Sequence, residues 1–256
     1  MSPENDGRRS RLEPQRYFES IDADTERLLA IATRGLDADV PCCPGWTVAD
    51  VVTHVAEVYE HKVRVMADNA WPDSWPPPGL ADQEPLGQLA DAKAHLFAEF
   101  AEHRITDETT TFYAGDRTIG FWARRMALEV AVHRYDAELA HGEVTAIPDD
   151  LALDGIDEVL RATLAGPWWV QRVSTRHPIG ADVAVESTGH RWVCSAEAKR
   201  VTIADDATSP AAATVTGQPA AVFLWLWGRV GDDQVTFEGD QGVVAEFRAR
   251  LVECTG

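Results

Sequence analysis

A change of pattern near Pro148 constrains the fold of this chain more than any other sequence feature. Before it, apolar residues recur at helical spacing in four segments separated by loops rich in proline or glycine. After it, short runs of β-forming residues alternate with helical patterns. The sequence therefore predicts an α+β protein with two domains: a four-helix bundle over residues 12–146 and a small α+β domain over residues 147–256.

The second helix has the best-defined start. Thr47 and Asp50 have the spacing of a capping box, and Trp46 and Val51 have that of a hydrophobic staple, so His54 falls in the second turn of the helix. Bundles commonly build metal sites from side chains that point inward from facing helices. The four expected helices cover residues 12–34, 47–68, 85–103 and 118–141.

The C-terminal part begins with one helical pattern and continues with strand patterns. Thr188 and Gly189 predict the turn of a hairpin. Strands are expected at 181–187, 191–196, 200–204, 212–216 and 234–237, and helices at 151–165, 220–227 and 241–252.

Glu129 and His133 are four residues apart within the fourth helical pattern, so their side chains lie on one face. With His54 from the second helix they would supply three metal ligands and leave one position open, which is typical of a catalytic zinc site. The same spacing also occurs in ordinary pairs on solvated helix faces. By itself, it leaves both interpretations open.

The composition excludes several classes of partner. A net charge of -19 disfavours binding to nucleic acid or to an anionic membrane surface. No run approaches the roughly 20 apolar residues of a membrane helix, and the polar N-terminus lacks the apolar segment of a secretory signal. We therefore expect a cytoplasmic protein. An anionic substrate would need local positive charge, from arginines or from a metal.

The cysteine pattern indicates neither a disulfide framework nor a thiolate zinc site, because no pair has Cys-x-x-Cys spacing. Cys42 and Cys43 are adjacent, whereas Cys194 and Cys254 are isolated. The adjacent pair is compatible with redox chemistry, although two small residues in a proline-flanked loop explain it more simply.

Four motifs occur together: Cys-Pro-Gly-Trp-Thr-Val-Ala-Asp-Val-Val-Thr-His (43–54), Gly-Asp-Arg-Thr-Ile-Gly-Phe-Trp-Ala-Arg-Arg (115–125), Glu-x-x-x-His-Arg (129–134) and Leu-Trp-Gly-Arg (226–229). In these motifs the chain resembles the maleylpyruvate isomerase family of mycothiol-dependent enzymes from actinobacteria. The resemblance implies a DinB-like four-helix metal domain followed by a domain related to sterol carrier proteins. It also implies zinc or another divalent metal, held by His54, Glu129 and His133, and mycothiol as a thiol cofactor.

Two positions qualify the resemblance. Similar family members often have a histidine just before the ligand glutamate, where this chain has Leu128, so we expect altered contacts near the substrate or the ligands. An arginine in the family's C-terminal domain is linked to activity, and Arg229 is the candidate for it here.

The resemblance implies addition of the thiol to a small electrophilic substrate. If the adduct rotates and expels the thiol, the reaction is a cis–trans isomerisation; if the adduct is kept, it is an S-transfer. Two further classes stay open: a metal- or thiol-binding protein without turnover, and a carrier of hydrophobic ligands suggested by the apolar stretch 223–227. An intact ligand set favours the enzyme. Both a monomer and a dimer are compatible with the sequence.

Other residues near the motifs have two interpretations. Asp136 could orient a ligand histidine or form an ion pair with an arginine. His61 could face the same side as His54, but a partly exposed structural role is favoured. Trp71 and Trp75 could cap a pocket or fasten a proline-rich loop. Three arginines could attract a carboxylated substrate, although surface pairing is expected for at least two of them: Arg124, Arg125 and Arg134.

Overall fold

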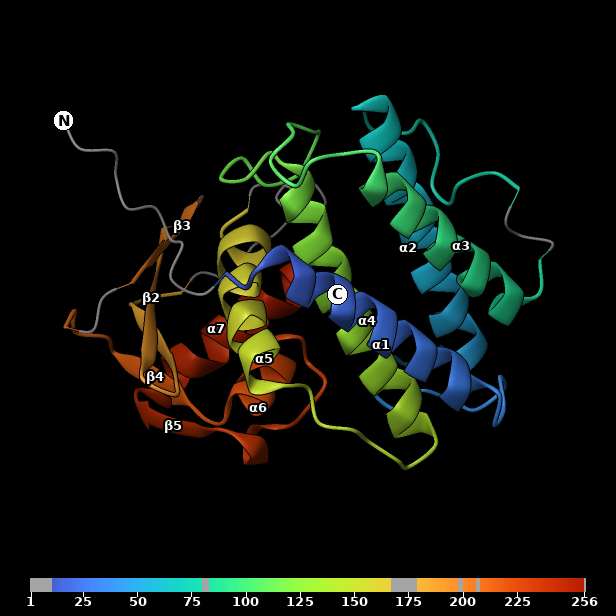
Figure 1. The fold of residues 1–256 in the computed structure, drawn as a ribbon. Coiled ribbons are helices and arrows are strands. Elements are labelled where there is room, and N and C mark those ends of the chain that lie inside the picture. The colour runs from blue at the N-terminus through green and yellow to red at the C-terminus, as the bar shows by residue number, and fades with distance from the viewer. Residues whose placement is uncertain (1–10, 80–82, 167–178, 198–199, 206–207, 256) are drawn as a thin grey trace. The chain divides into compact units, whose positions relative to one another are not determined.

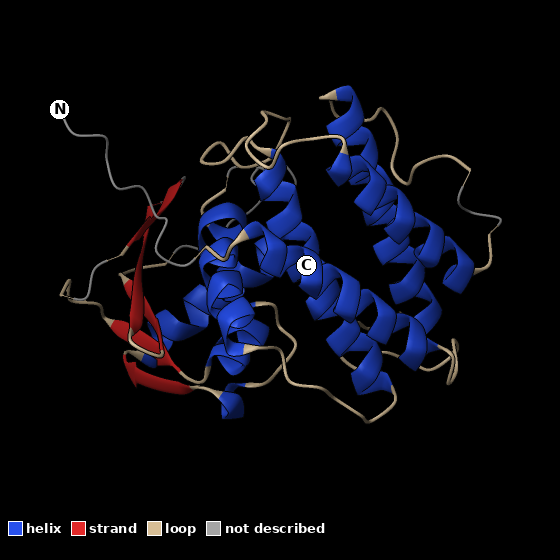
Figure 2. Cartoon of the chain, in the orientation of Figure 1, coloured by secondary structure: helices blue, strands red, loops and turns tan. Residues whose placement is uncertain are grey.

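The computed structural model describes residues 11–79, 83–166, 179–197, 200–205 and 208–255. Glu13–Thr145 form one compact unit, and the residues from Ala146 onward belong to a second. The described strands lie in the second unit, whereas the described helices of the first unit form a bundle (Figures 1 and 2). The predicted α+β class, with the helical part first, is confirmed.

Among the described residues of the first unit there are four helices. α1 packs against α4, and α2 packs against both α3 and α4 (Figure 1). The start of α2 follows the predicted signal, since Thr47 and Asp50 form both bonds of the capping box. Proline stands in the first turn of α1 and α3. The bounds are α1 Pro14–Ala32, α2 Val48–Asp68, α3 Pro85–Ala101 and α4 Ile119–Ala140.

Most side chains of α4 are buried, which explains one wrong expectation. Arg124, Arg125 and Arg134 are 3%, 8% and 1% exposed, so they are not the surface residues that the sequence suggested. α4 contacts both α1 and α2, and this leaves little of its circumference in water. Arg125 and Arg134 are paired with acidic side chains of the bundle.

In the second unit, the described strands form one mixed sheet in the order β3-β2-β1-β4-β5. β1 and β4 are parallel, and the other pairs are antiparallel. Thr188 and Gly189 form the predicted turn, with φ of 47° and 78°. The bounds are β1 Val183–Ser187, β2 His190–Glu197, β3 Arg200–Ala204, β4 Ala213–Thr216 and β5 Thr236–Gly239.

Helices cover this sheet. α7 (Gln241–Thr255) contacts β1, β4 and β5, and α5 (Asp149–Glu158) packs on α6 (Pro219–Leu226). A Cβ on Gly155 would lie 2.5 Å from the Phe223 ring, so the close approach of α5 to α6 requires glycine. The apolar side chains from Val222 to Leu226 are buried. Most of the stretch 223–227, which suggested a ligand carrier, is thus accounted for as a core helix.

Among the boundaries that differ from the sequence prediction are the end of α5 and the start of β5. The helix expected at 151–165 changes at Val159 into a π-helix, η1 (Val159–Leu164), and this segment carries Arg161, which bonds to Asp157 (2.6 Å). The last strand starts two residues later than expected because η2 (Asp232–Gln234) is a 3-10 turn held by Trp225, whose Nε1 donates to Asp232 (2.8 Å). No described helix is long and apolar enough to cross a membrane.

Candidate metal site

The three predicted ligands meet between α2 and α4. Glu129 Oε1 lies 3.3 Å from Nε2 of His54 and 3.4 Å from Nε2 of His133. The potential ligand atoms of the three side chains all lie within 4.8 Å of one another. Two imidazole nitrogens and one carboxylate oxygen are a donor set that suits zinc, so these residues fit the metal that the resemblance implies.

The second oxygen of Glu129 is held by Arg125, one turn earlier on α4. Arg125 Nη2 donates to Glu129 Oε2, while Oε1 faces the two histidines. Burial alone would raise the pKa of Glu129, but Arg125, followed by His133 and His54, holds it well below its usual range. Arg125 therefore keeps the carboxylate ionised and turns one oxygen toward the imidazoles.

Asp136 orients the second histidine. Its Oδ2 accepts from Nδ1 of His133 (3.0 Å), which places the lone pair of Nε2 toward Glu129 when the imidazole is neutral. Burial would lower the pKa of His133, but the bonds to Asp136 and Glu129 raise it to about 9. Asp136 is fully buried. Of the two roles that the sequence left open for Asp136, this geometry supports orientation of a ligand.

The adjacent cysteines contact the same aspartate. Cys42 Sγ donates to Asp136 Oδ1 (3.1 Å), and Cys43 Sγ lies 3.6 Å from Oδ2. The bond to Cys43 and burial, together with Asp136, raise the pKa of the Cys42 thiol. The two sulfurs and the carboxylate also form a second group of potential ligand atoms within 4.8 Å. Sequence spacing missed this cluster because Asp136 is 93 residues from Cys43.

Aromatic rings surround the two histidines. The Trp46 ring lies 5.1 Å from that of His54 and is nearly parallel to that of His133 at 6.3 Å. The Trp75 ring lies 6.3 Å from that of His54 and 5.1 Å from that of His61, and Trp75 is 51% exposed. His61 itself is 8% exposed, so the expected partly exposed position is wrong, although it does share the side of His54.

Two other expected positions lie elsewhere. Leu128 is fully buried and belongs to the core of the bundle. Arg229 lies in the second unit, just after Gly228, whose φ of 76° ends α6. The backbone N–H of Arg229 donates to Leu224 O (2.8 Å), and its Nη1 donates to Trp227 O (2.9 Å). Its role in activity stays a prediction.

A substitution of Asp136 tests the orientation of His133. Asp136→Asn should weaken zinc binding by about 10- to 100-fold, because a neutral amide holds the imidazole and its tautomer less well. Competition with a chromophoric chelator measures the affinity. Asp68→Asn, at an exposed position in the last turn of α2, is the matched control and should bind as the wild type does. Equal affinities in the two variants would contradict the orienting role.

Fold and site together define an α+β protein of two compact units, and the helical unit brings together two histidines and a glutamate that could hold a metal ion. Two family models match the chain in this order: the mycothiol maleylpyruvate isomerase N-terminal domain over residues 18–138 and the MDMPI C-terminal domain over residues 150–246. The chain belongs to the mycothiol maleylpyruvate isomerase family.

Solved structures support the fold. The chain is similar to the crystal structure of the mycothiol-dependent maleylpyruvate isomerase, with a TM-score of 0.59 and 16% identity over 89% of this chain and 93% of that chain. A histidine-to-alanine mutant of that enzyme matches with a TM-score of 0.58 and the same identity and coverage. No curated protein is significantly similar to the chain in sequence.

Proposed function

We propose that the chain is a mycothiol-dependent isomerase that uses a divalent metal, zinc in the first instance, to convert a small electrophilic substrate between cis and trans forms. The observation that carries this proposal is the convergence of His54, Glu129 and His133 in a member of this family. Three protein ligands leave a four-coordinate zinc ion one position for an exogenous thiol or water.

The chemistry needs a thiolate. A free thiol has a pKa of about 8.5 and is mostly protonated at neutral pH, whereas a bound divalent metal would deprotonate a coordinated thiol. His54 and His133 would contribute neutral nitrogens and Glu129 a negative oxygen. Arg125 and Asp136 would keep these groups in position, and the rings of Trp46 and Trp75 would restrict water around the histidines.

Thiol addition followed by rotation and elimination gives isomerisation, whereas retention of the adduct gives S-transfer. Both reactions share their first step and hence the same ligands. The alternative is a protein that is not an enzyme and binds metal or thiol without turnover, because fold alone does not define activity.

The test uses full-length protein purified without chelators or a histidine tag. We expect about one zinc per chain and mycothiol-dependent loss of the cis isomer of maleylpyruvate, with the trans product identified by NMR spectroscopy and the free thiol by mass spectrometry. A lasting thiol adduct would instead indicate the S-transferase. Bound zinc without any thiol-dependent change in a panel of electrophiles would favour the binding protein. His133→Ala should lose both metal and turnover.

Arg229 is proposed as a second residue required for activity. Because it lies outside the helical unit, its replacement should leave the zinc content unchanged. Arg229→Ala is therefore expected to lower turnover in a fully zinc-loaded protein, and Arg229→Lys to restore part of it. Unchanged kinetics in the alanine variant would remove Arg229 from the assignment.

A further inference from the structure

Lys62 has surroundings that the sequence did not reveal. It lies on α2, eight residues after His54, and its Nζ is 4.8 Å from the ring centre of Trp122 and 5.5 Å from that of Trp71. Nζ also donates to His61 Nδ1 (3.0 Å). Burial, together with Lys62 and Arg64, lowers the pKa of His61 to about 4, so its imidazole is neutral and can accept this bond.

Among the described residues, Lys62 forms no ion pair with a carboxylate. Lys93 shows the usual arrangement, since its Nζ lies 2.6 Å from both Asp22 and Glu26. The contrast is informative in a chain with 42 acidic and 23 basic residues, where acidic partners are abundant. Burial lowers the pKa of Lys62 to about 8; the charge of Glu129 opposes this shift, and that of Arg125 adds to it. A half-buried ammonium that has no ion-pair contact among the described residues would gain from an anionic ligand.

The position of Lys62 relates it to the metal site. On a helix, eight residues correspond to about 12 Å of axial rise, and side chains tilt toward the N-terminus, which here is the direction of His54. On α4, Trp122, Arg125 and Glu129 follow one another at helical spacing and lie on one face. Lys62 and Arg125 therefore place positive charge on the two helices that carry the ligands, and the charge of Glu129 acts on Lys62.

We propose that Lys62 binds a carboxylate group of the small substrate. This inference rests on the proposed function for its link to turnover. The ammonium has three donors, of which the bond to His61 occupies one. The flanking indoles reduce the solvation of the pair and so strengthen a charge-assisted bond. Trp71 is 47% exposed, so the Lys62 ammonium lies next to a side chain at the protein surface.

The experiment measures binding of maleate to the zinc-loaded, full-length protein by tryptophan fluorescence, because Trp71 and Trp122 flank the ammonium. Lys62→Met keeps the length of the apolar stem and removes the charge. It should weaken maleate binding by about 10- to 100-fold, the range for loss of a hydrogen bond to a charged group. Maleamide, the uncharged analogue, should bind equally to both proteins.

Kinetics provide the second measurement. In the isomerase assay, Lys62→Met should raise KM by about 10-fold or more with a smaller change in kcat, and Lys62→Arg should recover most of the loss. A merely structural lysine would not distinguish maleate from maleamide. Lys93→Met is the matched control, since its ammonium is already paired, and it should bind maleate as the wild type does.

The outcomes separate this inference from the proposed function. Maleate binding that depends on Lys62, in a protein without thiol-dependent turnover, would support the carboxylate site while the isomerase proposal fails. Turnover with wild-type KM and maleate affinity in Lys62→Met would overturn the inference while the isomerase proposal stands. If Lys62→Met lost zinc or helical circular dichroism, Lys62→Gln and Lys62→Arg would decide: equal maleate binding by these two variants would also overturn it.

Discussion

Replacing Glu129 with alanine is expected to abolish metal binding, reducing zinc from about one ion per chain to none. Glu129 supplies the only anionic ligand of the three, and its Oε1 is the atom that both imidazoles face. Without it, two neutral imidazoles would remain beside the positive charge of Arg125, which lies one turn away. The loss should exceed the roughly 10- to 100-fold effect of changes that only orient a ligand. Elemental analysis of protein prepared without chelators measures it.

The chain contains a matched control with the same spacing. Glu99 on α3 and His103 just after this helix are also four residues apart and lie in contact, with Oε1 2.7 Å from Nε2. They belong to no described group of three metal-ligating side chains. Glu99→Ala should therefore keep the wild-type zinc content. Equal zinc in Glu129→Ala and the wild type would show that the metal is held elsewhere and would remove the ligand assignment.

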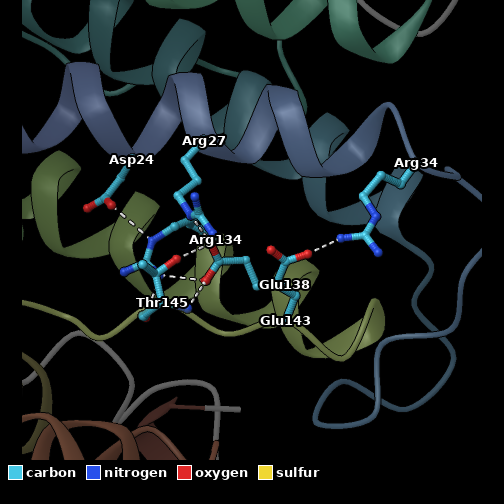
Figure 3. A network of polar contacts seen from close by, with 7 residues as sticks. All are labelled: Asp24, Arg27, Arg34, Arg134, Glu138, Glu143 and Thr145. Atoms are coloured by element: carbon cyan, nitrogen blue, oxygen red, sulfur yellow. Dashed lines mark hydrogen bonds and ion pairs between the residues drawn. The ribbon is translucent and has the colours of Figure 1, made fainter.

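Replacing Glu138 with alanine is expected to destabilise the helical unit by about 3–5 kcal/mol, the range for breaking a buried ion pair. Glu138 is fully buried near the end of α4, where it accepts from Arg134 (2.7 Å), Arg27 and the backbone of Thr145 (2.8 Å), as Figure 3 shows. Arg134 also pairs with Asp24 (2.9 Å) and is 1% exposed. The variant would remove one of the two carboxylates that pair with the buried guanidinium of Arg134.

Denaturant unfolding followed by far-ultraviolet circular dichroism measures this effect. Glu143→Ala is the control. Glu143 pairs with Arg34 (Figure 3), and the side chains of Glu143 and Arg34 are 61% and 49% exposed. An exposed pair contributes about 0–1 kcal/mol. Similar unfolding midpoints for Glu138→Ala and the wild type would contradict the proposed importance of the buried network.

The same network predicts a pH dependence. Burial would raise the pKa of Glu138, but bonds from Thr145, Arg134 and Arg27 lower it overall. A depressed pKa in the folded state means that the carboxylate contributes its full stabilisation above its unfolded pKa of about 4.3 and loses it as the pH falls through the lower folded value. The destabilisation caused by Glu138→Ala should therefore be largest near neutral pH and shrink in acid.

Local patterns were sufficient for several features. The start of α2 at Val48 follows from side-chain bonds between Thr47 and Asp50, which are three residues apart. The turn at Thr188 and Gly189 likewise depends on two adjacent backbone conformations. The shared face of Glu129 and His133 follows from helical periodicity alone. These features were predictable because each depends on residues within one turn or one hairpin.

Features that join distant residues needed the tertiary structure. The burial of Arg134 and its partners arises because α1 and α2 both pack on α4, which no periodicity within α4 reveals. The position of Lys62 between Trp71 and Trp122 depends on a loop and a second helix, and the contact of Cys42 with Asp136 joins residues 94 apart. The sequence by itself determined which side chains share a face of a helix. Only the packing of helix on helix decided which faces meet, because that choice depends on burial summed over the whole unit rather than on any local spacing.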